Sequence, residues 1–128
     1  MTNKEIIEKM YVDFGQGNVP EILNVMSDNV VIHTPGPGII PWAGTWKGKE
    51  GALEFFKNVG TSATYQKFEA TDFVVEGDKV VAIGNADFTS TTTGKAGTSN
   101  WVMVWTLQDG KATHVLNQWD TKAVAETL

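Results

Sequence analysis

Apolar residues recur with the period of an α-helix in the first sixty residues of the chain. Ile6, Met10 and Phe14 follow one another at four-residue intervals, which places them along one face of a helix. Pro20 suits the first turn of a second helix, and a third apolar stripe begins after Lys49. The pattern predicts helices over residues 3–14, 19–27 and 49–59.

From residue 64 onward the apolar period changes to two, which is typical of half-buried β-strands. Turn residues such as Glu76-Gly77-Asp78 separate the apolar runs, and such short links imply antiparallel neighbours. The pattern predicts strands over 30–33, 64–75, 79–92, 98–108 and 112–120, and a short helix over 121–127.

This order of elements predicts an α+β fold in a single domain over residues 1–128. We expect a cone-like curved antiparallel sheet with the three N-terminal helices on its concave side. Side chains on the concave face of such a sheet line a hollow.

The segment before the third predicted helix is unusually apolar for a loop. Residues 34–44 hold three prolines and three glycines, which exclude regular structure. The same segment holds Ile39, Ile40 and Trp42, and apolar side chains in a loop need a surface to cover. We expect it to cover a pocket mouth or a partner subunit.

Five tryptophans stand in this short chain, either as core residues or as the walls of a wide cavity. Trp42, Trp46 and Trp119 come from distant segments and predict an aromatic wall, which suits a rigid polycyclic or terpenoid ligand. Trp101 and Met103 share one strand face, and we expect the Trp101 end of that face to border the pocket.

Composition narrows the chemistry. The chain has no cysteine, only two histidines and a net charge of −5, which argues against disulfides, a thiol nucleophile, a metal site and a basic stripe for nucleic acid. No apolar run approaches the ~20 residues that span a bilayer. The first residues lack the order of a secretory signal, and no glycine loop that cradles phosphates follows a strand. We expect a cytoplasmic protein with no cofactor, no metal and no membrane partner.

Several motifs occur in a fixed order along the chain. Residues 28–36 read DNVVIHTPG, residues 42–50 read WAGTWKGKE, Phe55-Phe56 follow, and the chain later reads DGK at 109–111 and NQWDT at 117–121. Together they resemble a SnoaL-like domain of the nuclear transport factor 2-like superfamily. Ketosteroid isomerases, limonene epoxide hydrolases and polyketide cyclases are relatives in that superfamily. The resemblance implies the cone fold and its pocket, but one fold hosts many activities.

The resemblance also implies site positions. In epoxide hydrolase relatives, an asparagine two residues before the proline helps hold the reacting water, and His33 occupies that position. The same relatives use an aspartate base on the last strand, where this chain has Asn117, an amide that cannot act as a base. Met103 stands near the position of the protonated acid of the ketosteroid isomerases, and Tyr11 stands one residue from that of their oxyanion-hole tyrosine. The known catalytic sets are thus mostly missing.

Three titratable residues are candidates for chemistry. Asp120 is the leading carboxylate, because Trp119 beside it can raise its pKa; the alternative is a cap for the C-terminal helix. His33 is either a proton carrier or a hydrogen-bonded lining residue. Asp87 is a second carboxylate for the pocket if it points inward.

Two functions stay open. The first is binding of an apolar, oxygen-bearing small molecule, with general acid/base chemistry such as isomerisation, cyclisation or hydration. In that case His33 carries the proton, and Asn117 or Tyr11 polarises an oxygen atom. The second is a non-catalytic ligand-binding or protein-interaction domain.

Two structural expectations follow from these hypotheses. One cavity should be bordered by His33, Asn117 and at least two of the three wall tryptophans. The chain should also form a homodimer, because apolar strand residues stand opposite the expected pocket face. These residues are Val102, Val104 and Val115.

Overall fold

A computed structural model describes residues 1–128, which form four helices and six strands. The helices are α1 (Asn3–Gly15), α2 (Val19–Asn24), α3 (Gly48–Ser62) and α4 (Thr121–Ala125). The strands are β1 (Met26–Thr34), β2 (Gly44–Lys47), β3 (Ala63–Glu76), β4 (Lys79–Ser90), β5 (Ala96–Gln108) and β6 (Lys111–Trp119).

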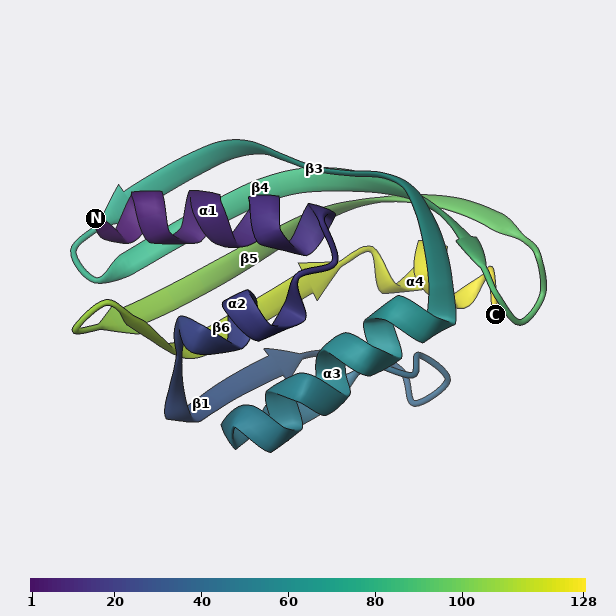
Figure 1. The fold of residues 1–128 in the computed structure, drawn as a ribbon. Coiled ribbons are helices and arrows are strands. Elements are labelled where there is room, and N and C mark those ends of the chain that lie inside the picture. Colours follow the sequence, from purple (N-terminus) through teal and green to yellow (C-terminus); the bar gives the residue numbers. More distant parts are fainter.

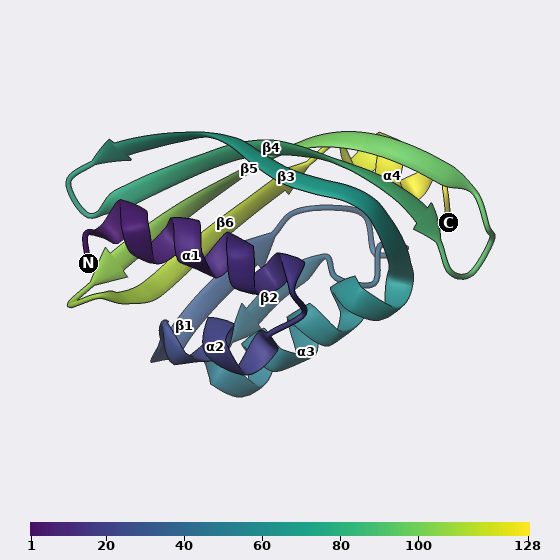
Figure 2. The same cartoon turned by 45° about the horizontal axis from the view of Figure 1, so that its top comes forward.

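The strands form one curved, open sheet in the order β2-β1-β6-β5-β4-β3. Figures 1 and 2 show the long strands β3, β4 and β5 arching over α1, with α2 and α3 on the same concave side. The predicted α+β fold with three N-terminal helices on the concave side is confirmed. The sheet is not wholly antiparallel, because β1 and β6 run parallel. No hairpin joins these two strands, so no short link sets their relative direction.

The N-terminal part differs most from the predicted boundaries. α2 ends at Asn24 and β1 begins at Met26, although the spacing predicts a helix up to residue 27 and a strand from residue 30. β2 was not predicted. It is four residues long and exists because it pairs with β1, from Val31 opposite Lys47 to Thr34 opposite Gly44. A strand this short carries too few residues for a period-two signal.

The start of α1 is fixed by a capping box. The Thr2 hydroxyl accepts from the Glu5 backbone N–H at 3.2 Å, and the Glu5 carboxylate accepts from the Thr2 backbone N–H at 3.0 Å. Further along the helix, Lys9 donates to the Asp13 carboxylate at 2.8 Å. These contacts stabilise α1 itself.

The two faces of the sheet carry different side chains, as β4 shows. Its even-numbered residues from Val80 to Ser90 are buried on the concave face, while its odd-numbered residues are only half-buried on the outer face. Gly84 leaves room on the concave face for the indole of Trp101, with which it is paired. Val115 also faces inward, so its expected place on the outer face is wrong; Val102 and Val104 do lie there.

None of the helices is long and apolar enough to cross a membrane.

Candidate functional site

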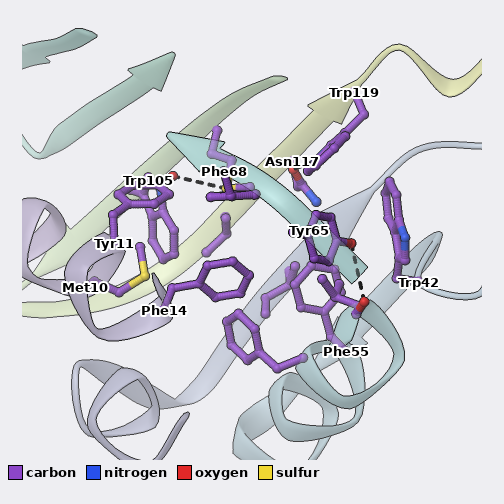
Figure 3. Close-up of a pocket in the computed structure, with 15 residues that line it drawn as sticks. Met10, Tyr11, Phe14, Trp42, Phe55, Tyr65, Phe68, Trp105, Asn117 and Trp119 are labelled. Atoms are coloured by element: carbon purple, nitrogen blue, oxygen red, sulfur yellow. Dashed lines mark hydrogen bonds between the residues drawn. The ribbon is translucent and has the colours of Figure 1, made fainter. Parts of the chain in front are cut away.

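A narrow hollow with an enclosed volume of about 30 Å³ lies between the concave face of the sheet and the helices. Fifteen residues line it, and fourteen of them are hydrophobic (Figure 3). The lining residues are Met10, Tyr11, Phe14, Ile32, Trp42, Phe55, Phe56, Val59, Tyr65, Phe68, Met103, Trp105, Val115, Asn117 and Trp119.

The cavity has two differently built ends. Figure 3 shows Met10, Tyr11 and Trp105 on one side and Trp42 with Trp119 on the other. The rings of Trp42 and Trp119 face each other with centroids 5.5 Å apart and a tilt of 55°. Trp42 reaches this position from the apolar loop before β2, so this part of the loop covers the cavity, while Ile39 of the same loop is exposed.

Asn117 on β6 is the one lining residue that carries an amide, and its side chain is almost fully buried. Its Oδ1 accepts from the indole Nε1 of Trp119 at 2.7 Å. Its Nδ2 donates to the hydroxyl of Thr34 on β1 at 3.4 Å, which is a long hydrogen bond. Two neighbouring strands therefore hold the amide in place.

Tyr11 on α1 supplies a hydroxyl at the other end of the cavity. Its oxygen accepts from Nε1 of Trp105 at 3.0 Å, and its proton is directed at the sulfur of Met103 at 3.1 Å. Burial raises the pKa of Tyr11 well above the ordinary value for a tyrosine. Tyr65 donates to the carbonyl of Val59 at 3.3 Å, and burial raises its pKa to about 12. Both phenols are therefore neutral near neutral pH, and neither is a base there.

His33 does not border the cavity. It lies exposed on the outer face, where its Nδ1 is 2.9 Å from the hydroxyl of Thr45 on β2. Its neighbours Ile32 and Thr34 are buried on the concave face, and side chains alternate along a strand. The expectation of one cavity bordered by both His33 and Asn117 is therefore wrong, although Trp42, Trp119 and Asn117 do border one cavity.

The two candidate carboxylates also lie outside the cavity. Asp120 is exposed at the end of β6 and caps α4, where its Oδ1 accepts from the backbone N–H of Ala123 at 3.1 Å. Such a cap stabilises by about 1 kcal/mol. Asp87 lies on the outer face of β4 and accepts from the Thr98 hydroxyl at 3.0 Å, because its neighbours Ala86 and Phe88 occupy the concave face.

Two of the expected lining tryptophans stand behind the wall. Trp46 donates from Nε1 to the carbonyl of Trp42 at 3.0 Å, so it supports the loop without reaching the cavity. Trp101 is covered by two stacked rings, Tyr11 at 5.3 Å and Phe68 at 5.0 Å between centroids. Met103 does line the cavity.

Sequence reasoning missed five further aromatic residues of the wall. They come from α1, α3 and β3, and each reads as an ordinary core residue at its spacing. Phe68 was the hardest to predict, because shifts in the pairing of β3 with β4 interrupt the alternation that would show which face it occupies. The missed residues are Phe14, Phe55, Phe56, Tyr65 and Phe68.

No group of three or more histidine, aspartate or glutamate side chains is placed to hold a metal ion. The lining residues carry only neutral polar groups: the amide of Asn117, the phenols of Tyr11 and Tyr65, and the indole N–H groups of the tryptophans. Such a lining can bind an apolar molecule and direct hydrogen bonds to one or two of its polar atoms.

Comparisons with known proteins agree with this architecture. A family model for a SnoaL-like domain matches residues 7–115. The solved structure of TerC co-crystallised with polyporic acid is 32% identical, and the match covers 98% of this chain and 96% of TerC with a TM-score of 0.87. A comparison with curated proteins finds no match.

Two further solved structures share the fold. An NTF2-like protein from Burkholderia xenovorans is 24% identical, with 98% of this chain and 94% of that chain covered and a TM-score of 0.88. A protein from Mesorhizobium loti, provisionally described as a SnoaL-like polyketide cyclase, is 22% identical, with 91% and 98% covered and a TM-score of 0.76.

Proposed function

The chain belongs to the SnoaL-like domain family, and on that premise we propose that its cavity binds a flat, apolar small molecule that carries an oxygen atom. The observation that carries the proposal is the lining itself: fourteen hydrophobic residues, most of them aromatic, surround a single buried amide. Aromatic walls bind flat rings by burying large areas, and one polar group fixes the orientation of the ligand.

A relative supports the proposed kind of ligand. TerC, which is 32% identical over nearly the whole chain, was co-crystallised with polyporic acid. Polyporic acid is therefore a suitable first probe for this chain.

The lining favours binding over proton transfer. None of the fifteen lining residues carries a carboxylate, an imidazole or an ammonium group. General acid/base catalysis needs a group whose pKa lies near the working pH, and the buried phenols titrate far above it. Binding without catalysis is therefore the main proposal.

An isomerase- or cyclase-type activity is the second candidate, because Tyr11 and Asn117 both present hydrogen-bond donors that can polarise a carbonyl oxygen. The two candidates are separated with β-tetralone, a fused-ring ketone with acidic protons next to its carbonyl. We expect it to bind while its protons exchange with D₂O no faster than in buffer, as followed by NMR. Faster exchange that Tyr11→Phe abolishes would favour the catalytic candidate.

Binding itself is tested with fluorenone and fluorene, two flat tricyclic molecules that differ by a carbonyl oxygen. We expect both to bind in equilibrium dialysis, and fluorenone to bind more tightly. Asn117→Leu should lower the affinity for fluorenone about tenfold, the equivalent of one hydrogen bond, and leave the affinity for fluorene nearly unchanged. Equal losses for both would mean that Asn117 only shapes the wall.

Gln118→Leu is the matched control, because it makes the same exchange of an amide for an apolar side chain one position along β6, on the exposed outer face. It should change neither affinity. Asn117→Leu also leaves Nε1 of Trp119 without its acceptor, so thermal melting must show that the variant is folded under the conditions of the assay.

A further inference from the structure

We propose that Trp119 fixes the orientation of the Asn117 amide and thereby makes the cavity selective for hydrogen-bond acceptors, such as a ketone or quinone oxygen, over donors. This inference rests on the proposed function, since it names the polar chemistry of the molecule that the cavity binds. It assigns to Trp119 a positioning role in specificity besides its place in the aromatic wall.

The indole of Trp119 fixes which atom of the Asn117 amide lies beside it. An indole Nε1–H can only donate a hydrogen bond. The amide atom that lies 2.7 Å from it must therefore be the oxygen of Asn117, whichever way an unconstrained amide would turn. A flipped amide would place two N–H donors against each other in a buried site, and this costs the free energy of unsatisfied donors.

Because the oxygen of Asn117 accepts from Trp119, the amide nitrogen is the atom that can bind a ligand. It carries two N–H groups. One is directed at the hydroxyl of Thr34 over a long 3.4 Å, and the other has no protein acceptor. Figure 3 shows the amide among the aromatic side chains of the wall, beside Trp119. A ligand oxygen that accepts from this nitrogen gains a hydrogen bond, whereas a ligand N–H or O–H placed there meets another donor.

The Tyr11 end of the cavity follows the same arrangement. There the indole Nε1 of Trp105 occupies the phenol oxygen at 3.0 Å, and the phenol proton is directed at the sulfur of Met103, a weak acceptor. At each end of the cavity, a tryptophan N–H donates to the oxygen of Tyr11 or Asn117, so the remaining polar group that a ligand can meet is a donor. Tyr65 differs, because it uses its proton on the carbonyl of Val59.

The inference is tested with three flat tricyclic probes of nearly equal size: fluorenone, which only accepts, carbazole, which donates through its N–H, and fluorene, which does neither. Equilibrium dialysis of the wild-type protein should give fluorenone an affinity about tenfold higher than carbazole, with fluorene between them or close to carbazole. Tenfold corresponds to one good neutral hydrogen bond.

Trp119→Phe keeps an aromatic ring in the wall and removes the N–H that orients the amide, together with one ring of the indole. The fluorenone-to-carbazole ratio should fall towards one in this variant, because Asn117 can then present either its nitrogen or its oxygen. Trp42→Phe is the control, since Trp42 faces Trp119 at 5.5 Å without any hydrogen bond to Asn117. It should weaken all three probes by a similar factor and keep the ratio.

A measurement on the unmodified protein covers the case in which Trp119→Phe does not fold. In ¹⁵N-edited NMR spectra, fluorenone should shift the side-chain N–H signals of Asn117, while fluorene should leave them nearly in place. The Nε1–H signal of Trp119 should stay hydrogen-bonded with both probes.

The outcomes separate the two proposals. If neither these probes nor polyporic acid bind, the proposed function is wrong. If they bind but carbazole matches or exceeds fluorenone, the binding function stands and the acceptor selectivity is overturned. If the fluorenone-to-carbazole affinity ratio of Trp119→Phe stays near that of the wild type, the cavity is selective but Trp119 is not the cause.

Discussion

On its concave face the sheet carries rings, methyl groups, a few hydroxyl groups and one amide, and on its outer face it carries histidines, carboxylates and lysines around an apolar centre. Side chains on the two faces come from the same strands and often from neighbouring residues, such as Ile32 and His33. The polar groups behave differently as well. On the outer face, hydrogen bonds from Asn85 and Lys67 hold the pKa of Glu69 below its ordinary value. Inside, burial raises the pKa of Tyr65 to about 12.

The comparison shows that the strands separate charge from the cavity. The exposed side of the sheet keeps ionised groups in water, where they cost little, and the cavity keeps only neutral groups. A ligand in the cavity therefore meets shape, aromatic surface and a few oriented N–H and O–H groups. The predictions below test how strictly this separation holds.

The largest effect on stability is expected where a side chain is added to the closely packed concave face of the sheet. A Cβ at Gly84 would overlap the backbone carbonyl of Glu69 and the indole of Trp101. Backbone atoms in a paired sheet cannot move aside easily, so we expect Gly84→Ala to lower the free energy of unfolding by about 3 kcal/mol or more. Urea unfolding followed by tryptophan fluorescence measures this change.

Gly60→Ala is the control for that experiment. Gly60 lies inside α3, and an added Cβ there meets no atom within 4 Å. Alanine is the better helix former by roughly 0.5–1 kcal/mol, so this variant should be slightly more stable than the wild type. A Gly84→Ala variant as stable as the wild type would show that the concave face is more adaptable than its packing indicates.

The buried phenols predict a loss of stability in alkali. Because the folded state raises the pKa of Tyr65 from 10.0 to about 12, it holds this proton more tightly than the unfolded state. The stabilisation is complete below pH 10 and is lost as the pH rises from 10 towards 12, by up to about 3 kcal/mol for this residue. Tyr11 acts in the same direction.

Urea unfolding at increasing pH, starting near neutrality, measures the decline. Tyr65→Phe should show a smaller fall above pH 10 than the wild type, since its side chain cannot ionise. Equal slopes for the two proteins would contradict the burial of this phenol.

On the outer face we propose that a second copy of the chain covers the apolar centre of the sheet. Val104 lies there between its cross-strand partners Val81 and Leu116, and Ile83 pairs with Val102 nearby. Light scattering should give twice the chain mass of 14.0 kDa. Val104→Lys should shift the protein towards the monomer by raising the dimer Kd at least about tenfold, because it buries a charge at the interface.

The matched variant for the dimer is Lys47→Ala, a change on the edge strand β2, away from this centre. It should leave the dimer intact. A wild-type protein that scatters as a monomer at micromolar concentration would refute the proposed pairing.

The smallest effect is expected for His33→Ala. This histidine is exposed and bonded to Thr45 on the outer face, so its removal should change fluorenone binding less than about twofold and stability by less than about 0.5 kcal/mol. A strong loss of binding would mean that the two faces of the sheet are coupled through β1, which contradicts the separation of the outer face from the cavity.

The order of the elements followed from periodicity alone, because a helix and a strand repeat their apolar positions at different intervals. The segment over Ala63–Trp119 was predicted within a few residues at most ends, since its hairpins place polar turn residues between alternating runs. β2 escaped prediction because its stability comes from pairing with β1.

The candidate site was predicted in part. Asn117 and at least two of the wall tryptophans were expected at one cavity, and Asn117, Trp42 and Trp119 line it. His33 and Asp87 were candidates because of their side-chain chemistry. Their apolar neighbours Ile32 and Phe88 are buried on the concave face, so alternation along the strand turns His33 and Asp87 to the outer face. Burying an ion instead of a ring would have cost several kcal/mol.

By itself, therefore, the sequence determined the element order, the α+β class and the apolar faces, because these depend on spacing along one strand or helix. Only the tertiary structure decided which faces meet. It brought Trp42 to Trp119 and Tyr11 to Trp105, and it joined Asn117 to Thr34 across two strands. Such contacts depend on sheet curvature and on parallel pairing between distant strands, and neither is recorded in the local spacing of residues.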